Sequence, residues 1–201
     1  MTPDCVLIAT GPSLTVADVG VARSSGCPVM VVNDAYRLVP DADLVYACDG
    51  EWWDRYHADV VTNTADAALW TASVDASAKY NLHHVPGNHH EAPNGVLFDV
   101  SGVGITYGGN SGYQLINLAF LLGYRAPVLL GYDMGHDANE PKHFFGAHPP
   151  ALEKPSPYAD WLRTFSKAAP VMKAAGMTIV NASRSTRLEC FPRKTIGELF
   201  G

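Results

Sequence analysis

The sequence predicts an α/β fold, a single Rossmann-like domain with an open, mainly parallel sheet and helices on both of its faces. Three observations lead to this prediction. The chain has 201 residues, the size of one ordinary domain. Its short apolar runs show no polar alternation, which is typical of strands that helices cover on both faces. The first two runs are separated by residues 13–27, enough for one helix, and such a βαβ unit makes its strands parallel.

Five strands are expected, one at each apolar run that a glycine or a polar residue ends. The runs are Cys5–Thr10, Val29–Asn33, Leu44–Cys48, Pro127–Gly131 and Met177–Asn181. His83–Val85 is a further candidate strand, and residues 86–104 are expected to be rich in loops.

Helices are expected between these strands. Two short ones are predicted at Glu51–Tyr56 and Asp66–Ala72. Ser111–Gly123 is mostly apolar and ends at a glycine suited to a helix C-terminus, so this helix should pack under the sheet. The apolar spacing of Trp161–Ala175 predicts a last helix, which Pro170 must kink or divide.

The composition is rich in apolar residues and poor in charge. Apolar residues make up 47% of the chain and charged residues 17%, so intrinsic disorder is excluded and a well-filled interior is expected. The net charge of −6 argues against a nucleic acid as partner, because a phosphate backbone is bound by a basic face. The chain lacks both a run of about 18 apolar residues and the basic start of a signal peptide, so we expect a cytoplasmic protein with no membrane span.

Neither the cysteines nor the first group of histidines predicts a metal site. The cysteines are scattered without a C-x-x-C pair, which favours buried free thiols over disulfides or zinc ligands. Gly87–Glu91 is similar to the G-N-H-[DE] piece of metallophosphoesterases, but the D-x-H and G-D-x-x-D motifs of those enzymes are missing. We therefore expect solvent-facing loop histidines and no bound metal; these residues are His83, His84, His89 and His90.

A ligand crevice is expected outside the carboxyl ends of the strands, where small and polar residues follow the apolar runs. The first turn, Gly11–Leu14, lacks the lysine of a P-loop, but Ser13 can bind a phosphate there or simply cap a helix. Gly108–Gly112 opens the apolar helix, which favours an anion site over a flexible loop with a capping residue. The candidate nucleotide-binding residues are Thr10, Gly11, Pro12, Ser13, Asn33, Asp49, Asn110, Ser111, Gly112 and Asp133.

A second histidine group follows the strand that leads to Asp133. His136, His143 and His148 lie within residues 135–158, which we expect to form a lid-like loop over the crevice. Imidazole transfers protons readily near neutral pH. One of these histidines is therefore a candidate general base, with a purely structural role as the alternative.

The order of these motifs resembles the small bacterial sialyltransferases that use CMP-sialic acid. It is similar also to the wider set that contains motility accessory factors and hydroxymethylpterin pyrophosphokinases. The matching pieces are Gly11–Leu14 after the first strand, Asn33 after the second, and Ser111–Gly112 leading into Ala119–Asp133. The family's H-Y-I-G-H is similar to His143–His148 with one inserted residue, whereas the segment between Trp53 and Gly108 shows no correspondence.

The resemblance implies a glycosyltransferase that needs no metal or other cofactor and takes a nucleotide sugar as donor. It implies that the first turn, Asn33 and Ser111–Gly112 bind the nucleotide. It also implies that His148 takes the proton from the acceptor hydroxyl, with His143 as the second candidate.

The chain departs from the family pattern in three places. Thr10 stands where the sialyltransferases have asparagine, and Asp49 stands near another nucleotide-binding asparagine. Gly135 and His136 stand where the family has tyrosines that assist the leaving phosphate, so His136 or Lys142 would have to supply the acid.

Two other functions stay open. Asp49 and Asp133 at neighbouring strand ends would suit a magnesium-dependent diphosphotransferase of the pyrophosphokinase type. The missing tyrosines would suit a module that binds a nucleotide or assembles with partners without catalysis. The sequence does not predict the sugar, the nucleobase, the acceptor or whether the chain forms a homo-oligomer.

Overall fold

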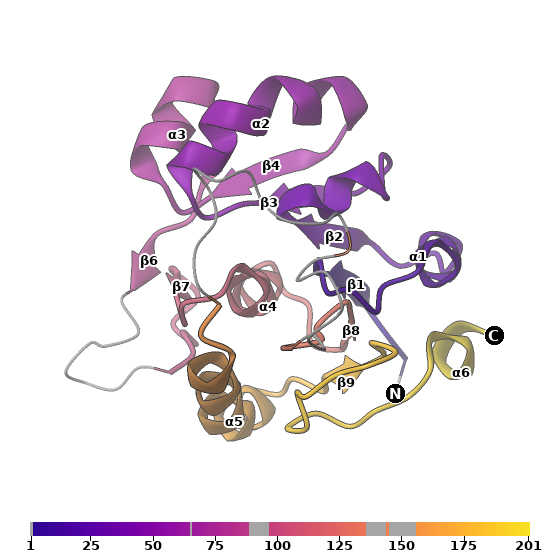
Figure 1. Ribbon diagram of the computed structural model, residues 1–201. Coiled ribbons are helices and arrows are strands. Elements are labelled where there is room, and N and C mark those ends of the chain that lie inside the picture. Colours follow the sequence, from indigo (N-terminus) through magenta and orange to yellow (C-terminus); the bar gives the residue numbers. More distant parts are fainter. Residues whose placement is uncertain (1, 65, 89–96, 136–143, 145–155) are drawn as a thin grey trace.

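The computed structural model describes residues 2–64, 66–88, 97–135, 144 and 156–201. They form a seven-stranded sheet with the strand order β5-β4-β3-β2-β1-β8-β9 (Figure 1). All neighbouring strands in it are parallel, which confirms the predicted Rossmann-like α/β class. The strands are β1 (Cys5–Ile8), β2 (Val29–Val32), β3 (Leu44–Tyr46), β4 (Ala68–Thr71), β5 (His83–His84), β8 (Pro127–Leu130) and β9 (Val180–Asn181). A separate parallel pair consists of β6 (Gly87–Asn88) and β7 (Ile105–Thr106).

The five predicted strands are all present, each somewhat shorter than its apolar run. The helix predicted at Asp66–Ala72 is wrong, because this segment forms β4. A run this short shows no helical periodicity of its own, and pairing with β3 on one side and β5 on the other decides its structure. The candidate strand at His83 is confirmed as β5, the edge strand of the sheet.

The helices are α1 (Val16–Arg23), the 3-10 helix η1 (Asn33–Arg37), α2 (Gly50–Asn63), α3 (Val74–Tyr80), α4 (Ser111–Leu121), α5 (Tyr158–Ala174) and α6 (Ile196–Phe200). The short helix predicted at Glu51–Tyr56 is the first part of α2, which continues because Val60 is buried beside Trp52 and Trp53. The sequence predicted that Pro170 would either kink or divide its helix. It does not divide the helix, because α5 is continuous from Tyr158 to Ala174. The proline side chain is exposed.

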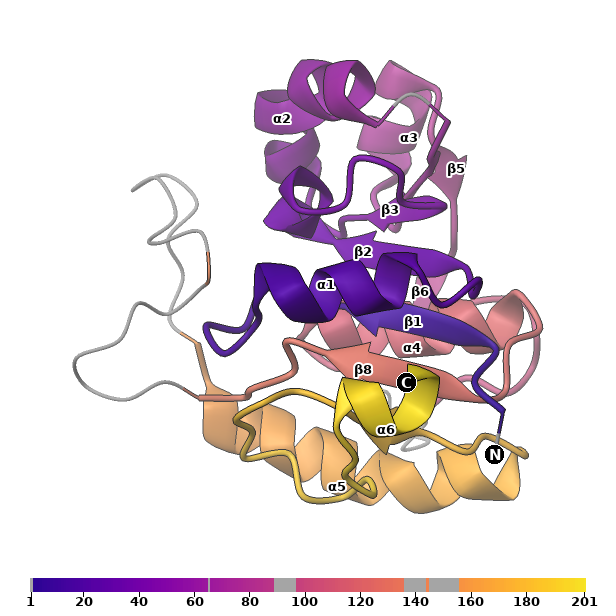
Figure 2. The same cartoon turned by 90° about the vertical axis from the view of Figure 1, so that its right-hand side faces the viewer.

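Two apolar cores cover the two faces of the sheet, and the strand residues alternate between them. Cys5 and Leu7 of β1 face the core that contains α4 and α5. Val6 and Ile8 face the core that contains α1 and α2. Figure 2 shows α1 and α6 in front of the sheet and α4 behind it. Burial on both faces is the physical reason for the unbroken apolar runs of the sequence.

The cysteines are free thiols, as predicted, but only Cys5 is fully buried. Cys27, Cys48 and Cys190 are partly exposed. Within the described residues, we find no helix that is both long and apolar enough to cross a membrane.

Candidate functional site

A pocket of about 390 Å³ lies at the carboxyl ends of the central strands. From β1 the chain builds the sheet outward to β5, and β8 then pairs with the other side of β1. The pocket therefore lies at the topological switch point, where ligands bind in open α/β sheets. Its lining residues are Ala9, Thr10, Gly11, Pro12, Val32, Asn33, Asp49, Gly109, Asn110, Ser111, Gly112, Gly131, Asp133, Met134, Gly135, Ser156, Pro157, Tyr158 and Trp161.

The structure brings the residues predicted from the strand ends together in this single pocket. Every predicted nucleotide-binding residue lines it except Ser13, which lies next to it. His136, His143, His148 and Lys142 lie outside the described residues, as do His89 and His90. Most of the expected lid, residues 135–158, lies outside them too, but Phe144 is described and donates its backbone N–H to the carbonyl of Thr10 at 2.9 Å.

The floor of the pocket is made of two glycine turns in close contact. The N–H of Gly11 donates to the carbonyl of Gly131 at 2.9 Å. A Cβ on Gly11 would lie 2.5 Å from that carbonyl and 2.5 Å from Cγ of Asp133. Gly131 has a φ of +69°, and a Cβ there would lie 2.5 Å from the carbonyl of Ala9. Only glycine allows the ends of β1 and β8 to meet this closely.

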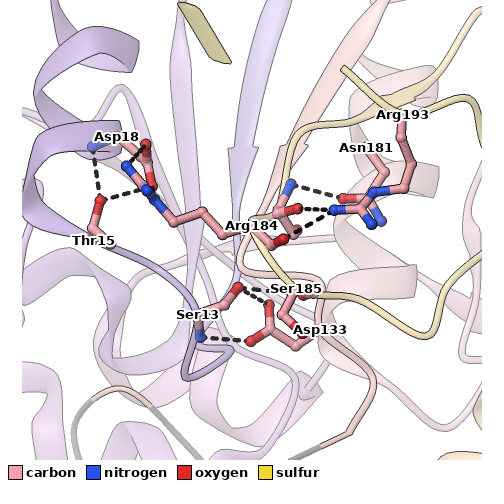
Figure 3. A network of polar contacts seen from close by, with 9 residues as sticks. Ser13, Thr15, Asp18, Asp133, Asn181, Arg184, Ser185 and Arg193 are labelled. Carbon is pink, nitrogen blue, oxygen red and sulfur yellow. Dashed lines mark hydrogen bonds and ion pairs between the residues drawn. The ribbon is translucent and has the colours of Figure 1, made fainter. Parts of the chain in front are cut away.

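Asp133 is a buried carboxylate that holds the first turn in place. The backbone N–H of Ser13 donates to its Oδ2 at 2.6 Å, and the Ser13 hydroxyl donates to its Oδ1 at 2.8 Å (Figure 3). The proposed role of Ser13 as a helix cap is wrong, because Thr15 is the N-cap of α1 and accepts from the N–H of Asp18. Ser13 thus ties the β1 turn to the β8 turn.

The N-terminus of α4 opens on the same pocket. Asn110 caps it by accepting the N–H of Tyr113 at 3.0 Å, as one of the sequence interpretations expected. The N–H groups of Ser111 and Gly112 belong to the first turn, where no preceding carbonyl of the helix reaches them. A Cβ on Gly112 would lie 2.9 Å from the ring of Tyr132. The helix start is thereby held close to β8.

An aromatic wall from α5 closes the side of the pocket and was missed by sequence reasoning. Tyr158 and Trp161 lie edge to face with ring centroids 5.4 Å apart. The indole Nε1 of Trp161 comes within 3.3 Å of the place where a Cβ on Gly109 would lie. A signal in the sequence could have indicated this wall. Pro157 stands directly before Tyr158 and Trp161, which are three residues apart, and proline is favoured around the start of a helix.

A strap formed by residues 182–193 runs beside the pocket after β9 and was also missed. The Thr186 hydroxyl donates to the carbonyl of Tyr132 at 2.7 Å, and the N–H of Arg187 donates to the carbonyl of Asp133 at 2.8 Å. Arg184 binds Asp18 of α1 through two hydrogen bonds of 2.6 and 3.0 Å (Figure 3). Burial alone would raise the pKa of Asp18, but hydrogen bonds from Arg184 and Thr15 outweigh it and lower the pKa.

Among the described residues that line the pocket, the charged side chains are carboxylates. Asp49 and Asp133 line it, while none of the described lining residues is a lysine or an arginine. The part of the chain that the structure describes holds no group of three or more histidine, cysteine, aspartate or glutamate side chains placed to bind a metal ion. The pocket combines helix N-terminal amides, small polar side chains and an aromatic wall, which suits a polar ligand with a planar ring.

No protein-family model matches the chain, and no curated protein matches it.

Proposed function

We propose that this protein is a transferase that takes a nucleotide-activated donor, and specifically a sialyltransferase-like glycosyltransferase with metal-independent chemistry. One observation supports the proposal above all. Polar residues that follow β1, β2, β3 and β8 meet the N-terminus of α4 in one pocket at the switch point of the sheet. Its volume of about 390 Å³ falls within the range of roughly 300–1,000 Å³ that is usual for small-molecule sites.

Each part of the pocket suits one part of a nucleotide. The first-turn N–H groups of α4 at Ser111 and Gly112 suit a phosphate, because the helix dipole favours negative charge there. Asn33 and Asp49 at the ends of β2 and β3 offer amide and carboxylate groups to ribose hydroxyls. The Tyr158 and Trp161 wall offers aromatic surface to a nucleobase.

The proposed reaction moves a sugar from the nucleotide to an acceptor hydroxyl. The acceptor oxygen forms a bond to the anomeric carbon, and the bond between that carbon and the phosphate oxygen breaks with its electron pair. The nucleotide leaves, and the hydroxyl proton goes to a general base. His148 is the proposed base, with His143 and then His136 as the other candidates; these roles stay predictions from the sequence.

Calorimetric titration with CMP, UDP and ATP tests the proposal. We expect one of these nucleotides to bind in the micromolar to millimolar range. Failure of all of them to bind at millimolar concentration would overturn it.

A matched pair of variants locates the binding. Asn33 and Asn81 both have positive φ, at 48° and 55°, and Asn81 ends α3 outside the pocket. Asn33→Gly and Asn81→Gly therefore remove an amide without straining the backbone. We expect only Asn33→Gly to weaken nucleotide binding, by about tenfold for a lost hydrogen bond of about 1.4 kcal/mol.

The magnesium-dependent diphosphotransferase is the second candidate, and one observation favours it. Asp49 and Asp133 line the same pocket. The prediction that they follow neighbouring strands is wrong, because β2 and β1 lie between β3 and β8. However, both carboxylate oxygens of Asp133 accept hydrogen bonds from Ser13. If Asp49→Asn and added EDTA both leave activity unchanged, this candidate is excluded. A noncatalytic binding or assembly module would be contradicted by a His148→Ala variant that binds nucleotide but has lost turnover.

A further inference from the structure

A second cleft lies between the strap and the helices α1 and α6, and we call it the strap cleft. Its volume is about 560 Å³. It is lined by Asp18 in the first turn of α1, by residues 182–184 after β9 and by residues 193–198 at the start of α6. None of these residues lines the nucleotide pocket, so the strap cleft is a separate site.

Ser13 connects the strap cleft with the nucleotide pocket. Its hydroxyl donates to the carboxylate of Asp133, which lines the pocket, at 2.8 Å. The same hydroxyl lies 3.3 Å from the carbonyl oxygen of Ser185, the neighbour of the cleft residue Arg184 (Figure 3). The two sites therefore lie side by side, and a ligand that extends out of one can reach the other.

The strap cleft has an excess of positive charge. Three cationic side chains and two carboxylates line it, which leaves one positive charge over. The cations are Arg184, Arg193 and Lys194, and the carboxylates are Asp18 and Glu198. Because the whole chain has a net charge of −6, this positive charge is a local feature of the cleft.

Both carboxylates of the strap cleft have partners of their own. Asp18 accepts hydrogen bonds of 2.6 and 3.0 Å from Arg184, so these two charges compensate each other. Glu198 accepts the backbone N–H and the hydroxyl of Thr195 at 2.7 and 2.8 Å. These hydrogen bonds, and more weakly the charge of Lys194, lower the pKa of Glu198.

Arg193 is held in place by the backbone and not by a carboxylate. Its Nη2 donates to the carbonyls of Ser183 and Arg184 at 2.7 and 3.0 Å (Figure 3). Among the described residues, no carboxylate forms an ion pair with Arg193 or with the exposed Lys194. Neutral carbonyls fix the guanidinium without cancelling its charge, so Arg193 is preorganised to bind an anion.

We propose that the strap cleft binds an anionic group of the acceptor, a carboxylate or a phosphate on a saccharide. This inference rests on the proposed function, because the acceptor must approach the nucleotide pocket from a neighbouring surface. The guanidinium of Arg193 can form charge-assisted hydrogen bonds to such a group, and Lys194 adds a second charge. One excess charge suits a single anionic group, whereas a nucleic acid is bound by many cations.

Calorimetry with four probes tests the proposal. The probes are a galacturonic acid trimer, galactose 6-phosphate, a neutral galactose trimer and inorganic phosphate. We expect both anionic saccharides to bind the parent protein at least about fivefold more tightly than the neutral trimer, because only they pair with the cations. Inorganic phosphate should bind more weakly than either, because it lacks the sugar.

Substitutions of the two cations locate this binding. Arg193→Ala should weaken both anionic saccharides about 10- to 100-fold, the usual loss for a hydrogen bond to a charged group, and Arg193→Lys should weaken them less. Arg193→Ala also frees two strap carbonyls. Lys194→Ala avoids this, because Lys194 is exposed and forms no hydrogen bond to a described residue through its side chain. It should weaken the same probes about fivefold.

Lys167→Ala is the matched control for Lys194→Ala. Lys167 is an exposed lysine of α5 and does not line the strap cleft. Its substitution should leave the affinity for all four probes within about twofold of the parent, since exposed charges distant from a site contribute little. The neutral trimer should bind all variants alike.

The outcomes separate the strap cleft from the proposed function. If Arg193→Ala and Lys194→Ala bind the anionic saccharides as tightly as the parent, the cleft assignment is overturned and the nucleotide site stands. If these probes bind and weaken as expected while no nucleotide binds the parent, the cleft stands as a saccharide site and the proposed function is overturned. If inorganic phosphate or duplex DNA binds more tightly than the saccharides, the acceptor assignment is overturned.

Discussion

The shape of the pocket depends on the absence of a side chain at Gly11. A Cβ at this position would lie 2.5 Å from the carbonyl of Gly131, which is backbone and cannot move aside cheaply. Gly11→Ala should therefore destabilise the protein by about 1–3 kcal/mol, the usual cost of inserting atoms into a packed site, and abolish nucleotide binding.

Gly20 is the matched control for this substitution. It lies inside α1, and a Cβ there would meet nothing within 4 Å. Gly20→Ala should stabilise the protein by about 0.5–1 kcal/mol through helix propensity. Urea unfolding of both variants is the measurement, and equal stability of the two would contradict the close approach of the turns.

Asp18 makes the stability of the protein dependent on pH in the acid range. Burial opposes its charge, but the hydrogen bonds from Arg184 and Thr15 lower its pKa below the unfolded value of about 3.9. A lowered pKa contributes stability that is fully present above the unfolded value and is lost as the pH falls through the folded value.

Asp18→Asn should therefore flatten the loss of stability below about pH 4. Urea midpoints of the parent and the variant, measured from pH 6 down to pH 3, give the comparison. Arg184→Ala should have a similar effect, because it removes the hydrogen bonds that lower the pKa. An acid dependence that both variants retain in full would show that other carboxylates cause it.

At the scale of elements, α5 contains a proline that lowers the stability of its own helix. Pro170 lies between Tyr158 and Ala174, has no N–H to donate to the preceding turn, and is exposed. Pro170→Ala should stabilise the protein, by up to about 3 kcal/mol in the helix interior. Thermal unfolding measures the gain. A lower midpoint would instead mean that packing around α5 requires the proline.

Whether the sequence predicts a strand depends on how completely that strand is buried. β1 and β2 are buried on both faces, so their residues are all apolar and the strands are visible in the sequence. β4 is only half-buried over Ala68–Trp70 and needs its neighbours to define it as a strand.

The candidate site shows the same division. Residues such as Asn33 and Asp49 were predictable, because the topology alone carries strand ends to one edge of the sheet. The contact between Ser13 and Asp133 spans 120 residues, and no local pattern indicates it. The strap is polar and irregular, so it gives no periodic signal, and its contacts with the turn after β8 are visible only in three dimensions.

At the scale of the whole molecule, the pocket joins the two halves of the sheet. Residues after β1, β2 and β3 line one part of the pocket, and residues after β8 line another part. A ligand that contacts both parts should therefore stabilise the folded protein against global unfolding. A nucleotide at 100 times its dissociation constant should stabilise the protein by about 2.7 kcal/mol. Thermal unfolding with and without CMP measures this, and Asn33→Gly should show a smaller shift at the same concentration.

β1 lies between β2 and β8, so the sheet cannot be completed until β8 has been synthesised. β1 is synthesised before β8, yet one of its edges pairs with β8, where Cys5 meets Pro127. A growing chain therefore carries an apolar strand with an unpaired edge until β8 has also left the ribosome, and such edges tend to pair with other chains. α6, which follows all the strands in the sequence, packs on α1 (Figure 2).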